Sequence, residues 1–179
     1  MSTRLVILGL LRERPLYGYE IKHIIEDHMG DWTSIAFGSI YFALGKLAKQ
    51  GFIDKVGTEQ RGSRPSRTVY AISESGHKEF IRLLREVWQE VERHYFALDI
   101  GLFFMDALPV EEVSRYLRGR IAQLEDIVTH IETHRQGQLA LEDVPRLAAA
   151  VFDHSQTHFR AELAWTRDLL LQVERGDYR

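Results

Sequence analysis

The stretch from Phe37 to Ile72 restricts the possible fold more than any other part of the chain. Residues 38–50 repeat apolar side chains at the spacing of an amphipathic helix. One face of that helix collects Ile40, Leu44 and Leu47. Gly51 follows directly, and a glycine commonly stands just past the end of a helix. The stretch therefore begins with one helix that has a single buried face.

Two short strands are predicted after this helix, at Phe52–Val56 and at Arg67–Ile72. The residues between them are rich in glycine, serine and proline, which do not sustain a regular element, and they include Arg61 and Arg64. A helix followed by a hairpin with an arginine-bearing tip is the outline of a winged helix-turn-helix. In such a fold the helix enters the major groove of DNA and the wing lies along phosphates, which supply affinity and register.

The outer face of the predicted helix has an unusual composition. It presents Phe42, Gly45, Lys46 and Lys49. A solvated helix face normally mixes both signs of charge, whereas this one has two lysines, an aromatic ring and no acid. We therefore expect it to bind a polyanion.

Charge is segregated along the chain. Residues 1–85 carry 13 Lys and Arg against 9 Asp and Glu, whereas residues 86–179 carry 10 against 17. The overall net charge of −3 conceals this division. We predict two domains: residues 1–85 form the winged helix-turn-helix, and residues 86–179 form an acidic helical domain.

Several protein classes are disfavoured by composition. The chain has no cysteine, so disulfides and thiolate metal sites are excluded. Its apolar start is at the short limit for a signal sequence and lacks a small-residue cleavage site. No stretch approaches the about 20 apolar residues that span a bilayer. We expect a cytoplasmic protein with no membrane association.

Two helices are predicted before the stretch that opens at Phe37. Leu5–Leu11 is apolar almost all round, which indicates burial on more than one side. Either a partner subunit covers one side, or the domain's own core covers both. The second helix begins near Gly18, with Ile21 and Ile25 at helical spacing. It should pack against the helix at residues 38–50, from which a turn separates it.

The remainder of the chain is predicted to be helical. Apolar residues from Phe80 to Met105 follow a nearly heptad spacing, although the charged stretch 89–94 leaves open a break between two helices. A further helix follows Pro109, residues 136–143 form a polar connection, and residues 144–173 form the last helix. The fold class is mainly α with a small β-hairpin wing.

Four segments in this order resemble a known family: LVILGLL, PLYGYEIK, GSIYFALGKLAKQGFI and RTVYAISESG. They are similar to the N-terminal domain of PadR-type bacterial transcriptional regulators and cover about half of the chain. The length of the remainder matches members with a larger multi-helix C-terminal domain. The resemblance implies a homodimeric winged-helix repressor. Its wing and the helix at residues 38–50, here called the reading helix, contact double-stranded operator DNA.

The resemblance assigns DNA contacts by position. They are Tyr19, Ser39, Tyr41, Lys46 and Lys49 on the helices, and Arg61, Ser63, Arg64 and Arg67 on the wing. Phe42 stands where the family usually has a long, often basic side chain. We therefore expect Phe42 to touch thymine methyl groups.

The C-terminal half carries many aromatic and histidine side chains. The resemblance implies a small aromatic or hydrophobic effector such as a phenolic acid, and the candidate effector contacts are Trp88, Tyr95, His154, His158 and Trp165. The alternative is that these aromatic residues form the core and the dimer seam. The pair His130 and His134 and the pair His154 and His158 have a spacing that suits a metal. The first pair lies off the apolar face and should meet solvent, and we expect no metal and no cofactor.

Nothing in the sequence favours an enzyme. No glycine-rich loop opens a helix after a strand, and no serine has a convincing base partner. The function predicted is therefore a homodimeric DNA-binding regulator, a repressor relieved by a small effector. The competing interpretation is a winged-helix module that binds protein and not DNA.

Overall fold

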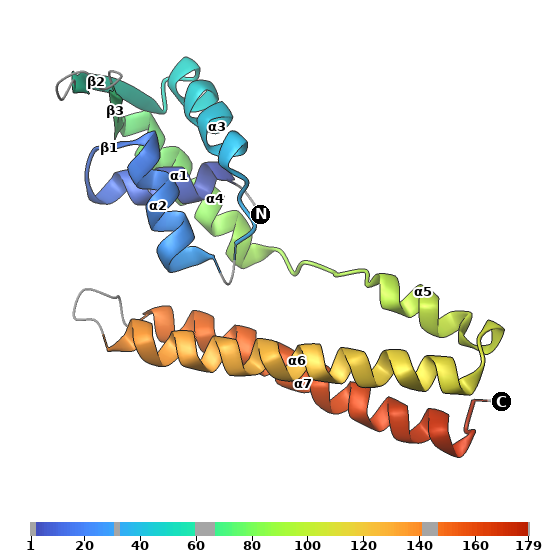
Figure 1. The fold of residues 1–179 in the computed structure, drawn as a ribbon. Coiled ribbons are helices and arrows are strands. Elements are labelled where there is room, and N and C mark those ends of the chain that lie inside the picture. The colour runs from blue at the N-terminus through green and yellow to red at the C-terminus, as the bar shows by residue number, and fades with distance from the viewer. Residues whose placement is uncertain (1–2, 31–32, 60–66, 141–146, 179) are drawn as a thin grey trace. The chain divides into compact units, whose positions relative to one another are not determined.

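The computed structural model describes residues 3–30, 33–59, 67–140 and 147–178 (Figure 1). The chain divides into two compact units, Met1–Glu92 and Arg93–Arg179. The predicted boundary between residues 85 and 86 falls inside a helix of the first unit, Glu74–Gln89. The division of roles between the two domains stays a prediction.

The first unit is built from four helices and three short strands within the described residues. In chain order these are α1 (Thr3–Glu13), β1 (Leu16–Tyr17), α2 (Gly18–Met29), α3 (Phe37–Lys49), β2 (Ile53–Glu59), β3 (Arg67–Ile72) and α4 (Glu74–Gln89). The strands form one antiparallel sheet in the order β1-β3-β2. The hairpin β2–β3 is the predicted wing, and the predicted fold class is confirmed.

β1 was not predicted from the sequence. It has two residues, too few to show alternation, and it exists because Leu16 pairs with Tyr70 and Tyr17 pairs with Val69 of β3. This pairing attaches the wing to the start of α2. It therefore links the hairpin to the helices across more than fifty residues of sequence.

α1 lies at the centre of the first unit. Ile7 and Leu8 are fully buried and Leu11 nearly so, and the helix contacts α3, α4 and β3. Leu5, Val6 and Leu10 of the same helix are half-buried and pack against this core. Coverage of their remaining exposed surface by a partner subunit stays a prediction.

The wing and α4 meet at a tight junction. Gly51 has φ +74°, the left-handed conformation that glycine adopts without strain, and this ends α3 as predicted. Ser73 caps α4, because its hydroxyl oxygen accepts a hydrogen bond from the Gly76 N–H at 3.0 Å. The Phe52 carbonyl accepts a hydrogen bond from the Ser73 N–H, also at 3.0 Å.

The second unit contains α5 (Ala97–Phe103), a short 3₁₀ helix η1 (Met105–Ala107), α6 (Val110–Leu139) and α7 (Leu147–Arg175). Residues 90–96 are not helical. The near-heptad stripe therefore does not belong to one continuous helix, and the break left open between residues 89 and 94 is present. No helix in the described part of the chain is long and apolar enough to cross a membrane.

The predicted polar connection at residues 136–143 is wrong for residues 136–139, which continue α6. Side-chain hydrogen bonds four residues apart stabilise this last turn. Gln136 donates to Glu132 at 2.8 Å, and Gln138 bonds the His134 ring at 3.0 Å. A polar composition alone does not end a helix when each polar side chain has a partner one turn earlier.

α6 and α7 run side by side as a long helical hairpin (Figure 1). One core cluster of this unit consists of Val113, Leu117, Leu169 and Val173, with Leu102 and Met105 packed against it. Elsewhere on the hairpin, Glu132 accepts hydrogen bonds from Gln136 and, across the helix pair, from Gln156 at 2.6 Å. These bonds hold the pKa of the Glu132 carboxyl below its ordinary value, so Glu132 stays charged and helps set the register of the two helices.

Candidate functional site

The two faces of α3 differ in the way the sequence predicted. Ile40, Leu44 and Leu47 are each about 1% exposed. On the outer face Phe42 is 74% exposed, and Lys46 and Lys49 are also exposed. No acidic side chain occurs anywhere in α3. The exposed face of α3 therefore carries one aromatic ring and two ammonium groups on the surface of the first unit.

Tyr41 lies at the contact between α3 and the start of α2. Its ring meets the Phe37 ring edge-on, with centroids 5.0 Å apart. A Cβ atom added at Gly18 would lie 2.8 Å from Cε1 of Tyr41. The absence of a side chain at Gly18 therefore allows Tyr41 to rest against α2 while remaining 46% exposed.

Ser39 differs from the other candidates because its hydroxyl already has a partner. It donates a hydrogen bond to the Ala36 carbonyl at 2.6 Å, in the first turn of α3. In this arrangement the Ser39 oxygen can accept a hydrogen bond, but its proton is engaged. A DNA phosphate, which only accepts, would have to displace the Ala36 carbonyl.

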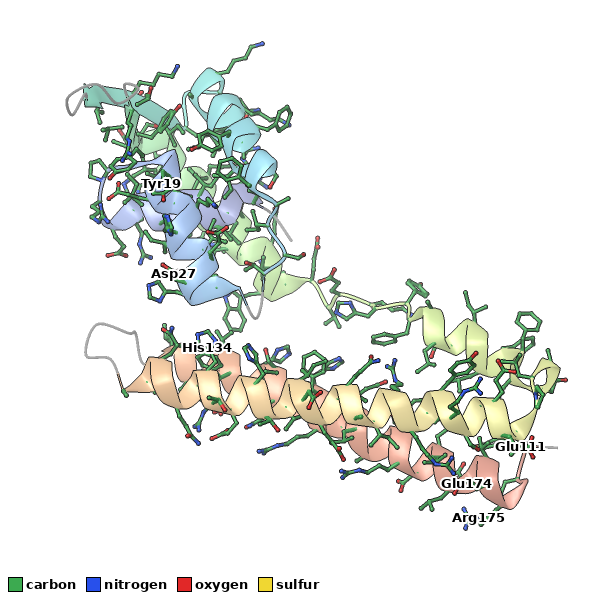
Figure 2. The ribbon with its side chains drawn as sticks, viewed as in Figure 1. Tyr19, Asp27, Glu111, His134, Glu174 and Arg175 are labelled. Atoms are coloured by element: carbon green, nitrogen blue, oxygen red, sulfur yellow. The ribbon has the colours of Figure 1, made fainter. Side chains whose placement is uncertain are left out.

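Arg67 stands at the base of the wing, as the first residue of β3. Its guanidinium carbon lies 5.2 Å from the centroid of the Tyr17 ring and 5.7 Å from that of Tyr19. Tyr19, labelled on α2 in Figure 2, is 49% exposed. Its ring meets the His23 ring edge-on, with the two ring centroids 4.3 Å apart. The structure thus brings together two predicted contacts, Tyr19 and Arg67.

Three other predicted wing residues, Arg61, Ser63 and Arg64, lie in the segment 60–66, outside the described residues. The structure also shows two contacts that join different elements. Tyr17 lies under Arg67, and the Lys22 ammonium lies 5.0 Å from the Phe37 ring centroid. Each of these pairs joins two different elements, so no spacing along one helix or strand signals it.

The predicted effector contacts do not form one group. Trp88 is on α4 in the first unit and is 84% exposed, whereas the other four are in the second unit. His154 and His158 are exposed on α7, and the His158 ring stacks on Phe96 at 6.4 Å. Tyr95 is 81% exposed in the non-helical segment before α5.

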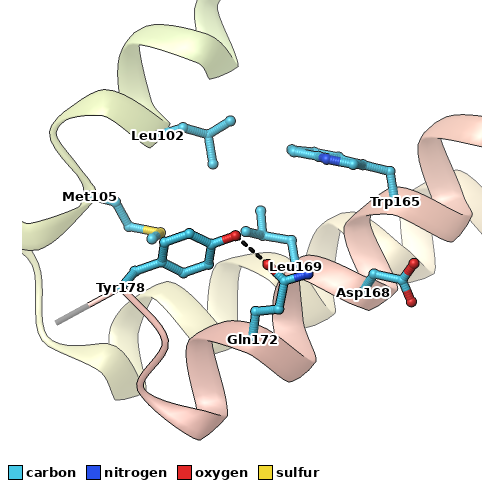
Figure 3. A pocket seen from close by; sticks show the side chains of 7 residues that line it. All are labelled: Leu102, Met105, Trp165, Asp168, Leu169, Gln172 and Tyr178. Atoms are coloured by element: carbon cyan, nitrogen blue, oxygen red, sulfur yellow. Dashed lines mark hydrogen bonds between the residues drawn. The ribbon is translucent and has the colours of Figure 1, made fainter.

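Trp165 does line a cavity, of about 200 Å³ (Figure 3). The lining residues are Leu102, Met105, Trp165, Asp168, Leu169, Gln172 and Tyr178. The Tyr178 hydroxyl donates a hydrogen bond to the Gln172 side-chain oxygen across its rim. The lining residues come from α5, η1 and the C-terminal part of the chain, which meet only in the folded unit. Of these residues, only Trp165 was among the effector contacts predicted from the sequence.

Neither histidine pair belongs to a cluster of potential metal ligands. Within the described part of the chain, no three His, Asp or Glu side chains are close enough together to hold a metal ion. His130 is exposed as predicted. The expectation that His134 also meets solvent is wrong, because its half-buried ring contacts Phe152 of α7 edge-on at 5.5 Å. The helical periodicity of α6 alone carries no information about α7, which covers His134.

Comparison with known proteins agrees with this arrangement. Residues 7–82, which include α3, the hairpin and most of α4, match the model of the family described as "Transcriptional regulator PadR-like family". This part of the chain is similar to that family. Its resemblance to PadR-type regulators, inferred from four sequence segments, is confirmed.

The similarity to PadR proteins extends over both units. The negative transcriptional regulator PadR of Bacillus subtilis is 23% identical over 177 residues, which cover 94% of this chain and 96% of that protein. The crystal structure of B. subtilis PadR in complex with operator DNA has a TM-score of 0.78 at 20% identity and covers 95% of this chain and 98% of that one.

Two further structures share the fold. B. subtilis PadR in complex with p-coumaric acid has a TM-score of 0.74 at 19% identity, covering 96% of this chain and 94% of that one. The Vibrio cholerae virulence activator AphA has a TM-score of 0.74 at 18% identity, covering 97% and 99%. The PadR-type fold therefore serves proteins named for repression and for activation.

Proposed function

We propose that this PadR-like regulator binds operator DNA as a homodimer and represses transcription. The observation that carries the proposal is the outer face of α3, where Lys46, Lys49 and an exposed Phe42 stand on a helix without an acid. Ammonium groups on such a face neutralise phosphates, and an apolar ring can contact thymine methyl groups. Arg67, exposed at the start of β3, is a further cation of the same unit.

The relatives support each part of this proposal to a different degree. A PadR protein with the same fold has been crystallised with operator DNA, and the sequence relative is named a negative regulator. AphA, with the same fold, is named an activator. Repression is therefore tested with a reporter gene under the protein's own promoter: expression that rises when the regulator is deleted supports it, and expression that falls overturns it.

Dimerisation is proposed from the apolar surface of the second unit. Ile100, Phe103 and Phe104 on and just after α5 are 66%, 80% and 61% exposed. Large apolar side chains grouped in this way mark a surface that another protein covers. A second copy would also provide the second reading helix, and two such helices reach successive major grooves when they stand about 34–36 Å apart.

Binding of DNA is tested by fluorescence anisotropy with a labelled duplex from the protein's own promoter. Affinity is expected to fall by about three orders of magnitude between about 50 and 200 mM salt, because phosphate contacts release counterions. Lys46→Ala and Lys49→Ala should each weaken binding about tenfold and reduce the salt slope, equally for all sequences. Phe42→Ala should instead change which sequences are preferred.

The matched control is Lys78→Ala. Lys78 is exposed on α4 of the same unit, where it pairs with Glu74 at 2.8 Å. Its loss should leave DNA affinity unchanged. If Lys46, Lys49 and Lys78 variants behave alike, α3 is not the reading helix. If the wild-type protein shows no salt-dependent binding, the winged-helix module that binds protein rather than DNA becomes the better interpretation.

We propose further that a small aromatic compound relieves repression by binding in the second unit. The cavity beside Trp165 and the exposed rings of Tyr95, His154 and His158 are the candidate contacts in this unit. B. subtilis PadR has been crystallised with p-coumaric acid, which makes phenolic acids the first compounds to test.

This effector proposal predicts reciprocal coupling. A phenolic acid that lowers DNA affinity by a given factor must itself bind more weakly, by the same factor, when DNA is present. Calorimetric titration of p-coumaric acid into the free protein and into the protein–DNA complex measures both. Equal affinities in the two titrations, or no binding in either, contradict relief of repression by this compound class.

A further inference from the structure

We propose that Tyr17 is a positioning residue for DNA binding. Together with Tyr19 it forms a seat, the two-tyrosine seat, that holds the Arg67 guanidinium ready for a phosphate. This inference deepens the proposed function and rests on it. Tyr17 itself need not touch DNA, because it acts through the arginine.

Strand pairing explains why Tyr17 and Arg67 meet. Tyr17 of β1 pairs directly with Val69 of β3, and Arg67 lies two residues before Val69 on the same strand. Residues two apart on a strand share a face, so Tyr17 and Arg67 are diagonal neighbours across the ladder. Diagonal neighbours lie within reach of aromatic and long side chains. The two-residue strand β1 is thus what delivers the Tyr17 ring to Arg67.

Tyr19 completes the seat from a different element. It lies in the first turn of α2, and its ring centroid is 5.7 Å from the Arg67 guanidinium carbon, against 5.2 Å for Tyr17. Both distances are within the range of cation–π attraction. Arg67 remains exposed, so the two rings orient its charge without removing it from solvent.

The seat suits arginine in particular. A guanidinium stacks on aromatic faces through its plane, while its N–H groups lie in that plane and can form two parallel bonds to a phosphate. Holding the side chain before DNA arrives reduces the conformational entropy that binding would otherwise lose. Arg67 is the first residue of β3, so the held cation stands at the end of this strand.

A double-mutant cycle on the full-length protein tests the seat. The probe is a labelled mixed-sequence duplex of about 30 base pairs at low salt, because a phosphate contact is independent of sequence. Arg67→Ala should weaken binding and lower the salt slope by about 0.9 for each phosphate that the variant leaves unneutralised. Tyr17→Leu should weaken binding about two- to fivefold for each subunit on the duplex, whereas Tyr17→Phe, which keeps the ring, should bind like the wild type.

The decisive outcome is coupling. In the Arg67→Ala background, Tyr17→Leu should have no further effect on affinity. Thermal unfolding of each variant shows whether Tyr17→Leu disturbs folding, and Tyr17→Met, which also removes the ring, takes its place if it does. Full additivity of Tyr17→Leu and Arg67→Ala, or equal losses for Tyr17→Phe and Tyr17→Leu, overturns the seat.

One alternative role for Arg67 needs its own variant. The sheet places Glu59 of β2 directly opposite Arg67. If Arg67→Ala loses its effect on affinity in a Glu59→Gln background, Arg67 acts by neutralising Glu59, and the inference fails. Binding that depends on Lys46 and Lys49 but not on the seat would leave the proposed function standing. A wild-type protein that does not bind the duplex would remove both.

Discussion

Replacing Gly76 with alanine is expected to destabilise the first unit by about 3 kcal/mol, near the upper end of what overpacking costs. A Cβ atom at this position would lie 2.0 Å from the Phe52 carbonyl oxygen and 2.8 Å from Cγ1 of Ile72. The carbonyl cannot simply turn away, because it accepts the hydrogen bond from the Ser73 N–H that joins the end of α3 to the start of α4. Either that bond is lost or α4 moves off the sheet.

Urea unfolding followed by circular dichroism measures this effect. Gly45→Ala is the matched control, since Gly45 also lies in a helix of the first unit and a Cβ there meets nothing within 4 Å. Alanine at Gly45 should stabilise the unit by up to about 1 kcal/mol, through helix propensity. Equal unfolding midpoints for the two variants would show that α4 does not approach Phe52 as closely as the structure places it.

Placing glutamate at both Phe103 and Phe104 is expected to give a folded monomer that binds promoter DNA about 100-fold more weakly or worse. The reason is that linking two DNA-binding domains raises the affinity by a factor of about 10² to 10⁴. These rings are 80% and 61% exposed in the single chain, so the substitutions cost little there. In a dimer that covers them, four carboxylates would lose their hydration.

Two measurements separate this result from a direct effect on DNA contact. Light scattering coupled to size exclusion gives the mass, and anisotropy gives the affinity for the promoter duplex. The double variant Lys46→Ala with Lys49→Ala should show the opposite combination, a dimer that binds DNA weakly. A Phe103→Glu, Phe104→Glu protein that stays dimeric would mean that another surface joins the subunits.

Some of the candidate site could be predicted from the sequence because it lies on one element. Lys46, Lys49 and Phe42 share the outer face of α3 through helical spacing alone, and burial in the structure agrees. The end of α3 at Gly51 was predictable for the same reason, since a backbone preference acts locally.

Other features depended on neighbours that no local pattern contains. β1 exists only through its pairing with β3, and the close approach of Gly76 to Phe52 only through the junction of wing and helix. His134, which its own helix predicts to be solvent-exposed, is half-buried because Phe152 of α7 lies against its ring. The cavity beside Trp165 likewise needs α5, η1 and α7 together.

The sequence by itself determined the type of most elements, the inner and outer faces of α3, and the resemblance to PadR-type regulators, because periodicity, capping and turn preferences act within a few residues. Only the tertiary structure decided where the chain breaks between α4 and α5, which glycine tolerates no side chain, and which rings lie beside Arg67. Those outcomes depend on contacts between segments far apart in the chain, and the energies of such contacts are set by the three-dimensional arrangement rather than by the order of residues along any one segment.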